Sequence, residues 1–362
     1  AEDGIRDLVR SRGLGDVYKR QAQLCKSLKK DFRPRITNTR KPVSCWSEKD
    51  VLNKKIVDAF VIIFRTRGCS WALNSGCSMC GYFNDSSFSK VSDEDILTQF
   101  DAVMEKYENQ KFVKIFNSGS FLDGKEISPK VREKILQKLS EKADKISIES
   151  RPEFITDETL SKIKKIMNST IFEIGVGLET ADDDIRKSNI NKGFTFKDYK
   201  NAADLIKKHG FSLKTYVLIK PPFMSEKRAI EDVIQTVDKI KDITDIVSFN
   251  PCNVQRNTVV EYLWRGKQYR PPWLFGVVEI LKESKKIANN VLLKCDISGG
   301  GSIRGPHNCK NCDKIYLKAI SEFSLSQDVK VFKDLKCECR EKWLDQLDIE
   351  ELGFGSLTNM YG

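Results

Sequence analysis

The sequence has 362 residues, with 62 Lys and Arg against 51 Asp and Glu, which gives a formal net charge of +11. This length allows one large barrel with an appendage or two ordinary domains. No apolar run approaches the length of a membrane span and no secretory pattern is present, so we expect a cytoplasmic protein with no membrane partner. The eleven cysteines are clustered, which favours metal binding over disulfides, and the positive charge favours a polyanionic partner.

Residues 1–21, "AEDGIRDLVRSRGLGDVYKRQ", fit neither a helical nor a strand period. They resemble a translated sequencing-library adapter whose variable index would lie at residues 8–10. We therefore interpret this segment as an artefact of sequence assembly and leave it out of the fold. A genuine disordered arm is the alternative. A basic N-terminal lead follows over residues 22–55, with seven Lys or Arg and one Asp between residues 26 and 42.

Short apolar runs alternate with segments of helical spacing along the middle of the chain. The runs predict strands at residues 58–64, 111–117, 145–150, 171–179, 212–219 and 245–251. Start signals predict helices after Ser92, Ser128, Thr156, Thr195 and Ser225. Six such units predict an α/β fold over residues 56–290, with a parallel sheet that is either open and doubly wound or a closed or partial barrel. From residue 291 to 362 the pattern becomes rich in Gly and Cys, which predicts a small separate domain.

Three cysteines follow the first predicted strand in "RGCSWALNSGCSMCGYFND", residues 67–85. Thiolates from Cys69, Cys77 and Cys80 can bind three irons of a four-iron cluster and leave the fourth iron open to a substrate or cofactor. A zinc site that takes a fourth ligand from elsewhere, or plain buried cysteines, are the alternatives. Both layouts of a parallel sheet place chemistry at the carboxyl ends of the strands, where this loop lies.

A second group of cysteines lies near the C-terminus. Cys309 and Cys312 are spaced C-x2-C, and Cys337 and Cys339 are spaced C-x-C, which together offer four thiolates for a tetrahedral Zn²⁺. His307 and Cys295 are reserve ligands. A second iron–sulfur cluster is the alternative, because thiolates suit both.

A three-cysteine loop after the first strand of a six-unit β/α chain resembles the radical S-adenosylmethionine (SAM) superfamily. The wide C-x7-C gap resembles the group related to the Elongator catalytic subunit, as do "ESRPEF" (149–154) and "EIGVGLETADDDIRKSNINKGFT" (173–195). The stretches 249–274 and 298–313 resemble the archaeal radical SAM proteins of archaeosine biosynthesis. The resemblance implies a partial (β/α)6 TIM-type barrel of the radical SAM kind, a [4Fe–4S] cluster on Cys69, Cys77 and Cys80 as catalytic ligands, and SAM as the second cofactor.

The resemblance also implies which side chains contact SAM. Tyr82 would support the adenine. Asn117, Ser118, Gly119 and Ser120 stand where the superfamily has its Gly-Gly-Glu stretch near the methionine amino group, which is a departure from the usual pattern. Glu149 and Arg151 suit the ribose hydroxyls and the carboxylate, and Glu179 and Lys220 would lie at the rim, facing SAM or substrate. An ordinary salt bridge at a strand end is the alternative for each.

The activity that the resemblance implies is a lyase reaction in tRNA. In it, a lysine adduct on a 7-deazaguanine base of the D-loop is cleaved at a carbon–nitrogen bond and a formamidine remains. The expected partners are tRNA, the lysine-transferring archaeosine synthase subunit and an electron donor. Basic residues suited to RNA phosphates are Lys29, Lys30, Arg33, Arg35, Arg40, Arg265 and Arg270. Two other functions stay open: a radical SAM enzyme for another tRNA base or small molecule, and a non-catalytic Fe–S or zinc RNA-binding protein.

Overall fold

The structure is a computed structural model of the chain, and it describes residues 22–28, 38–87 and 91–352. The segment interpreted as an adapter, residues 1–21, lies outside the described residues. So do four of the basic residues predicted to contact RNA, namely Lys29, Lys30, Arg33 and Arg35. Among the residues that the structure describes, no helix combines the length and the apolar character needed to cross a bilayer.

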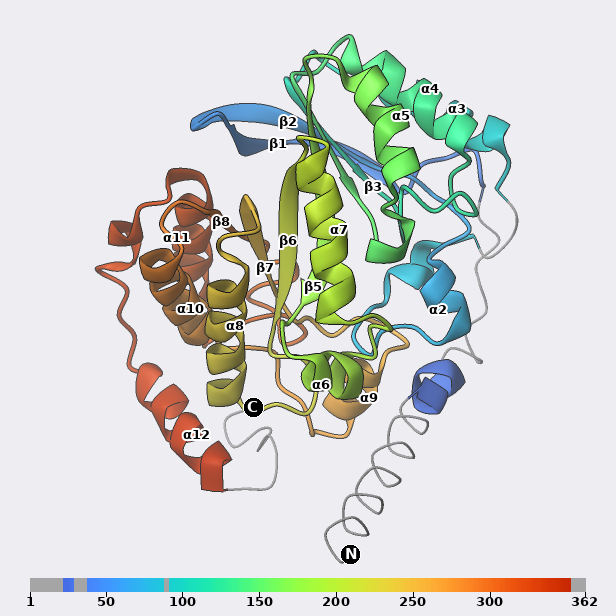
Figure 1. The fold of residues 1–362 in the computed structure, drawn as a ribbon. Helices are drawn as coiled ribbons and strands as arrows, with labels where there is room; N and C mark the ends of the chain where they lie inside the picture. The colour runs from blue at the N-terminus through green and yellow to red at the C-terminus, as the bar shows by residue number, and fades with distance from the viewer. Residues whose placement is uncertain (1–21, 29–37, 88–90, 353–362) are drawn as a thin grey trace, which may run out of the picture.

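One curled eight-stranded sheet forms the centre of the molecule, with its strands in sequence order (Figure 1). The strands are β1 (Ser44–Leu52), β2 (Lys55–Ile63), β3 (Phe112–Phe116), β4 (Lys145–Glu149), β5 (Ile171–Glu179), β6 (Ser212–Ile219), β7 (Ile246–Pro251) and β8 (Leu292–Cys295). Strands β2 to β8 are parallel, and β1 pairs antiparallel with β2. The predicted partial barrel of parallel strands is thereby confirmed, and its six predicted strands correspond to β2–β7.

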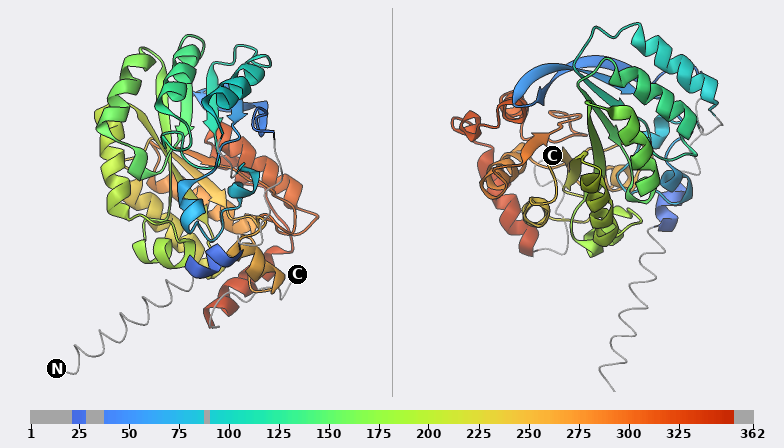
Figure 2. Two further views of the ribbon diagram at one scale, coloured as in Figure 1. Left: turned by 90° about the vertical axis from the view of Figure 1, so that its right-hand side faces the viewer. Right: turned by 45° about the horizontal axis from the view of Figure 1, so that its top comes forward.

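Helices cover the outer face of this sheet, as the turned views in Figure 2 also show. The longer ones are α3 (Asp93–Met104), α4 (Pro129–Ser140), α5 (Asp157–Met167), α7 (Phe196–Lys208), α8 (Glu226–Ile240), α10 (Leu274–Ile287), α11 (Asp313–Ser326) and α12 (Arg340–Leu352). The five predicted N-caps are confirmed, because the side chains of Ser92, Ser128, Thr156, Thr195 and Ser225 each accept a hydrogen bond from a backbone N–H in the first turn. These caps fix where each helix starts after its strand.

Two predicted boundaries are corrected. Residues 44–52, placed in the basic lead, form β1, which turns into β2 through Asn53 and Lys54, both at positive φ. Residues 292–295, placed in a separate C-terminal domain, form β8 and pair with β7. The main apolar core also continues without a break from the barrel into α11 and α12, where Phe323 and Trp343 are buried. The C-terminal region is therefore packed into the barrel rather than set apart from it.

Ionic side chains fill the interior at the amino ends of the parallel strands. Glu173 on β5 is fully buried and forms ion pairs with Lys145 of β4 and Lys214 of β6. Asp50 on β1 pairs with Lys114 of β3 and Lys294 of β8, so one carboxylate bridges the two edge strands. Because each buried charge has a partner, the network can close this end of the barrel without leaving uncompensated charges. The carboxyl ends of the strands form the other end of the barrel, its mouth.

Candidate active site at the barrel mouth

The loops at the carboxyl ends of β2, β5 and β7 carry the short helices α2 (Ser70–Asn74), α6 (Asp183–Ile185) and α9 (Val259–Arg265), which lie at the same end of the sheet (Figure 1). A smaller apolar core joins α9 to residues 22–28 and to Cys77 and Met79 of the cysteine loop. The first cysteine loop is therefore enclosed by segments that are far apart in the sequence.

Cys69, Cys77 and Cys80 all lie on this loop and are all partly buried. Cys69 is the N-cap residue of α2, and Gly68 and Gly76 adopt positive φ on either side of that helix. Burial raises the pKa of the Cys80 thiol to about 12, and the charges of Cys77 and Cys69 add to the effect. The three sulfurs are thus close enough to interact, and a bound cation would favour the thiolate form of the buried Cys80.

Residues 117–120 follow β3 and lie directly beside this loop. A β-carbon at Gly119 would lie 2.6 Å from the Cα of Cys69, so only glycine fits there. Asn117 and Ser120 are buried, and the hydroxyl of Ser120 accepts a hydrogen bond from the backbone N–H of Arg151 at 3.0 Å. Ser118 in the same stretch is partly buried. The predicted stretch is therefore placed against the cysteine loop.

Glu126 lies behind this stretch and was not found from the sequence. One of its carboxylate oxygens accepts from the Thr66 hydroxyl at 2.5 Å and the other from the Ser120 backbone N–H at 2.7 Å. Burial raises its pKa to about 7 despite these hydrogen bonds. Nothing in the local sequence marks this residue, because its role depends on where the loop after β3 folds.

Glu149 and Arg151 extend from the end of β4 into the mouth. Burial raises the pKa of Glu149, although a hydrogen bond with Tyr216 of β6 works against that shift. The Arg151 guanidinium donates to Glu153 at 2.6 Å and to the backbone carbonyl of Lys192 at 3.0 Å. Glu149 and Arg151 therefore lie at the carboxyl end of β4, and Arg151 is already engaged by protein groups.

Glu179 ends β5 at a φ of +70°, a backbone conformation that is costly for a residue other than glycine. Its carboxylate lies 2.5 Å from the ammonium of Lys192, a residue that sequence reasoning missed although it lies in the "NINKGFT" stretch quoted above. Burial alone would lower the pKa of Lys192, but the charges of Glu179 and Cys77 outweigh it and raise that pKa. The mouth thus holds a buried ion pair close to the cysteine loop.

Two of the predicted positions need correction. Lys220, expected at the rim, is fully buried and lies 2.9 Å from Glu226 at the start of α8. Arg270, expected to contact RNA, is 5% exposed, donates to the carbonyls of Pro271 and His307, and lies 3.7 Å from the Trp273 ring centroid. Both cations are used inside the protein, because a buried charge is stable only with partners.

The other predicted contacts are open to solvent. Tyr82, at the start of the short helix η1 (Tyr82–Asp85), is 58% exposed. The side chain of Arg265 is 70% exposed although it pairs with Glu261, and that of Arg40 is 68% exposed and pairs with Asp95. These three side chains are accessible to a ligand.

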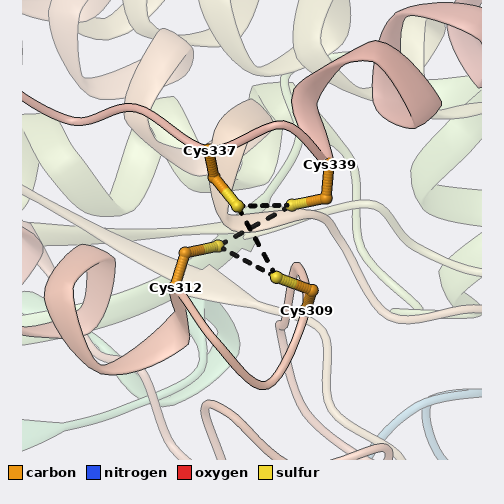
Figure 3. A group of neighbouring side chains, drawn as sticks. All are labelled: Cys309, Cys312, Cys337 and Cys339. Atoms are coloured by element: carbon orange, nitrogen blue, oxygen red, sulfur yellow. Dashed lines mark hydrogen bonds between the residues drawn. The ribbon is translucent and has the colours of Figure 1, made fainter.

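The second group of cysteines converges in the way that the spacing predicted (Figure 3). The neighbouring sulfur–sulfur distances are 3.5 Å for Cys309–Cys312, 3.7 Å for Cys309–Cys337, 3.7 Å for Cys312–Cys339 and 3.4 Å for Cys337–Cys339. Among the described residues, these four form the one set of His, Cys, Asp and Glu ligand atoms that all lie within 4.8 Å of one another. His307 and Cys295, the reserve ligands, are not part of that set.

Residues 63–237 match the radical SAM superfamily. The chain belongs to this superfamily, as the cysteine loop and the partial barrel indicated. Over 322 residues it is 41% identical to a Methanosarcina acetivorans protein named archaeosine synthase subunit beta, and the match covers 88% of this chain and 93% of that protein. A Thermococcus kodakarensis protein of the same name is 39% identical over 305 residues, covering 82% and 94%. Among solved structures, the archaeal Elp3 of Methanocaldococcus infernus is 17% identical with a TM-score of 0.47, covering 74% and 63%.

Membership in this superfamily implies a [4Fe–4S] cluster and SAM, and the residues at the mouth fit such groups. Three thiols more widely spaced than the C-terminal four suit a cluster of several irons, whose thiolates bind different metal atoms. A β-carbon at Gly177 would lie 2.8 Å from both Glu179 and Lys192, so the strand end is kept free of side chain beside the ion pair. The donor set and the space therefore agree with the cofactors that the family uses.

Proposed function

We propose that this protein is the radical SAM lyase of archaeosine formation in tRNA. Its substrate would be a lysine adduct on a 7-deazaguanine base in the D-loop, and cleavage of a carbon–nitrogen bond would leave a formamidine on the base. The observation that carries the proposal is the 41% identity to the M. acetivorans archaeosine synthase subunit beta over 93% of that protein. The three-cysteine loop at the mouth of the barrel supports the same conclusion.

In this proposal Cys69, Cys77 and Cys80 bind the cluster and the remaining iron is left for SAM. When bound, the cluster and SAM would supply one-electron chemistry, in which an electron from the donor cleaves SAM and a hydrogen atom is removed from the substrate. The protein supplies orientation and exclusion of water. Candidates to orient SAM are Tyr82, residues 117–120, Glu149, Arg151 and Glu179, whereas the buried Lys220 would act only through Glu226.

RNA contacts are proposed at loops around the mouth. Exposed side chains there include Tyr82 after β2, Phe223 after β6, Tyr262 on α9 and Ile303 after β8, each more than half exposed. Exposed aromatic rings provide stacking surfaces for unpaired bases, and the exposed Arg265 offers a charge for phosphate. The target base must leave its place in the folded tRNA before the mouth can receive it.

The name of the relatives, subunit beta, supports a partner subunit for this chain as well. We propose that this partner is the subunit that transfers lysine to the base, since its product would be the substrate here. A one-electron donor is also required, because SAM cleavage consumes an electron. Arg40 is an exposed cation that either RNA or a partner can contact.

For the C-terminal cysteines we propose a single Zn²⁺. Four sulfurs at about 2.3 Å from a tetrahedral ion lie about 3.8 Å from one another, and the neighbouring sulfurs here are 3.4–3.7 Å apart. Cys309 and Cys312 precede α11, and Cys337 and Cys339 precede α12. A bound ion would therefore join the starts of two helices that pack on the barrel.

The decisive experiment is anaerobic incubation of the reconstituted protein with SAM, dithionite and tRNA carrying the lysine adduct, with and without the lysine-transferring subunit. Nucleoside mass spectrometry should detect archaeosine. Formation of 5′-deoxyadenosine without archaeosine, even with the partner present, would instead assign a different substrate. Absence of both, together with the absence of an iron–sulfur chromophore, would support a non-catalytic RNA-binding protein. Metal analysis of the purified protein should give one zinc per chain.

A further inference from the structure

The seven residues between Cys69 and Cys77 make this cysteine loop unusually wide, and the structure contains a specific contact for them. Residues 70–74 form α2, and Trp71 on this helix donates a hydrogen bond from its indole Nε1–H to the backbone carbonyl of Asn191 at 2.8 Å. The ring also fills the space beside Gly193, where a β-carbon would lie 2.6 Å from ring atoms. Gly193 has a φ of +79°, so both the backbone and the space there require glycine.

The other end of the gap is held by the same loop after β5. The side-chain amide of Asn191 donates to the hydroxyl of Ser75 and to the carbonyl of Gly76, both at 2.7 Å. On the far side of Cys77, the backbone N–H of Ser78 donates to the carbonyl of Ile190 at 2.8 Å. The cysteine loop is thus joined to residues 189–194 on both sides of Cys77.

Residues 189–194 also carry Lys192, whose ammonium is close enough to the cysteine loop to interact with Cys77. Lys192 pairs with Glu179 at 2.5 Å, and its backbone carbonyl accepts a hydrogen bond from Arg151 at 3.0 Å. The Arg151 guanidinium lies 5.3 Å from the ring centroids of both Trp71 and Phe194, so it is held between the gap helix and the loop. A shift of the 189–194 loop would therefore move the Lys192 ammonium and release one side of Arg151.

We propose that Trp71 and Asn191 are positioning residues for SAM cleavage. By joining the cysteine gap to residues 189–194, they hold Lys192 and Arg151 at fixed places beside the cluster ligands. The wide gap exists, on this account, to provide the helix that carries Trp71. The proposal concerns SAM cleavage in the absence of RNA, so it rests on membership in the superfamily and not on the identity of the tRNA substrate.

The test compares Trp71→Ala, Trp71→Phe and Asn191→Asp with the control Leu73→Ala, which changes a side chain on the same helix that is 42% exposed. Trp71→Phe keeps a ring but loses the indole donor, and Asn191→Asp replaces the donating amide with an acceptor that faces the Gly76 carbonyl. The first measurement is hydrogen–deuterium exchange of the protein without cluster. We expect exchange of residues 189–194 to rise about tenfold in the three test variants, as loss of one hydrogen bond allows, and to stay unchanged in the control.

The second measurement uses protein with the cluster reconstituted and no RNA. We expect the iron content to be unchanged, the SAM-induced change in the electron paramagnetic resonance spectrum to be altered, and 5′-deoxyadenosine formation to fall about tenfold to a hundredfold. Trp71→Ala should have the larger effect and Trp71→Phe the smaller, and the latter carries the test if the alanine variant fails to fold. Exchange and spectra equal to wild type in Trp71→Phe and Asn191→Asp would overturn the proposal. Loss of cluster iron in both would overturn it too, because the contact would then serve assembly of the ligand loop.

Discussion

The two groups of cysteines differ in number, spacing and place in the fold. The first group has three thiols on a loop at the carboxyl end of β2, and the charges of Cys69 and Cys77 contribute to the raised pKa of Cys80. The second group has four sulfurs 3.4–3.7 Å from their neighbours, at the starts of α11 and α12. Three ligands at the mouth of a barrel leave room for a reactant, whereas four closely spaced ligands fill the coordination sphere of an ion.

The surroundings of the two groups of cysteines also differ: charged and strained residues surround the first group, and apolar residues surround the second. Around the first lie Glu179, whose positive φ is a costly backbone conformation, and its buried ion pair with Lys192. Around the second lie the apolar side chains of Tyr316, Phe332 and Trp343, which belong to the main core. Strain and buried charge are tolerated where chemistry needs them, and an apolar surrounding suits a site whose task is stability.

The largest effect is expected from Cys77→Ala, which removes one of the three proposed cluster ligands. We expect complete loss of 5′-deoxyadenosine formation and of the iron–sulfur chromophore after anaerobic reconstitution, with little change in the melting temperature of the unreconstituted protein. Absorbance and chromatography measure the first two, and calorimetry measures the third. Cys45→Ala, on β1, is the matched control and should retain colour and activity. A coloured, active Cys77→Ala variant would remove the distinction between the two groups.

Cys337→Ala should give the reverse pattern. Loss of one of four ligands should abolish zinc binding and lower the free energy of unfolding by several kcal/mol, because binding energy at a structural site is folding energy. Each kcal/mol shifts Tm by about 1.4 °C in a chain of this size, so a fall of roughly 5 °C is expected. The cluster at the mouth should still assemble in protein kept cold. If the melting temperature stays at the wild-type value, the C-terminal group has no structural role.

Gly119→Ala tests how tightly the first group is enclosed. The added β-carbon would lie 2.6 Å from the Cα of Cys69, so the loop or the strand end must move. We expect SAM cleavage to fall about tenfold to a hundredfold, since small displacements at a reacting centre are costly. Gly124→Ala is the matched control, because its β-carbon would meet only Pro129 at 3.8 Å. Equal activity of the two variants would mean that residues 117–120 do not set the position of the cysteine loop.

Whether the sequence predicts an element or a site residue depends on whether its signal is local in the sequence. Apolar runs predicted strands β2–β7. Strand β1 lacks such a run, because its buried residues include acids such as Asp50, which pairs with lysines. Strand β8 has only four residues, too few for a periodic signal. Cysteine spacing predicted both groups of cysteines, because ligand spacing is local in sequence, and the structure brings the four C-terminal sulfurs together. Lys192 and Trp71 could not be found in this way, since their partners come from other strands, and the burial of Arg270 depends on the distant His307 loop.

The smallest effect is expected from His307→Ala, and it tests whether the second group is complete with four thiols. His307 precedes Cys309 by two residues, yet its Nδ1 lies 2.7 Å from the carbonyl of Gly305, a contact in which a neutral ring donates. Burial and the nearby Arg270 charge lower its pKa to about 4, so the ring is neutral at neutral pH. The variant should keep one zinc per chain, measured by atomic emission, and lose at most about 1 kcal/mol of stability with that hydrogen bond. A zinc content near zero would show that the imidazole replaces one of the four thiolates. The C-terminal group would then not be a complete set of four thiolate ligands, and its contrast with the three-cysteine group would no longer hold.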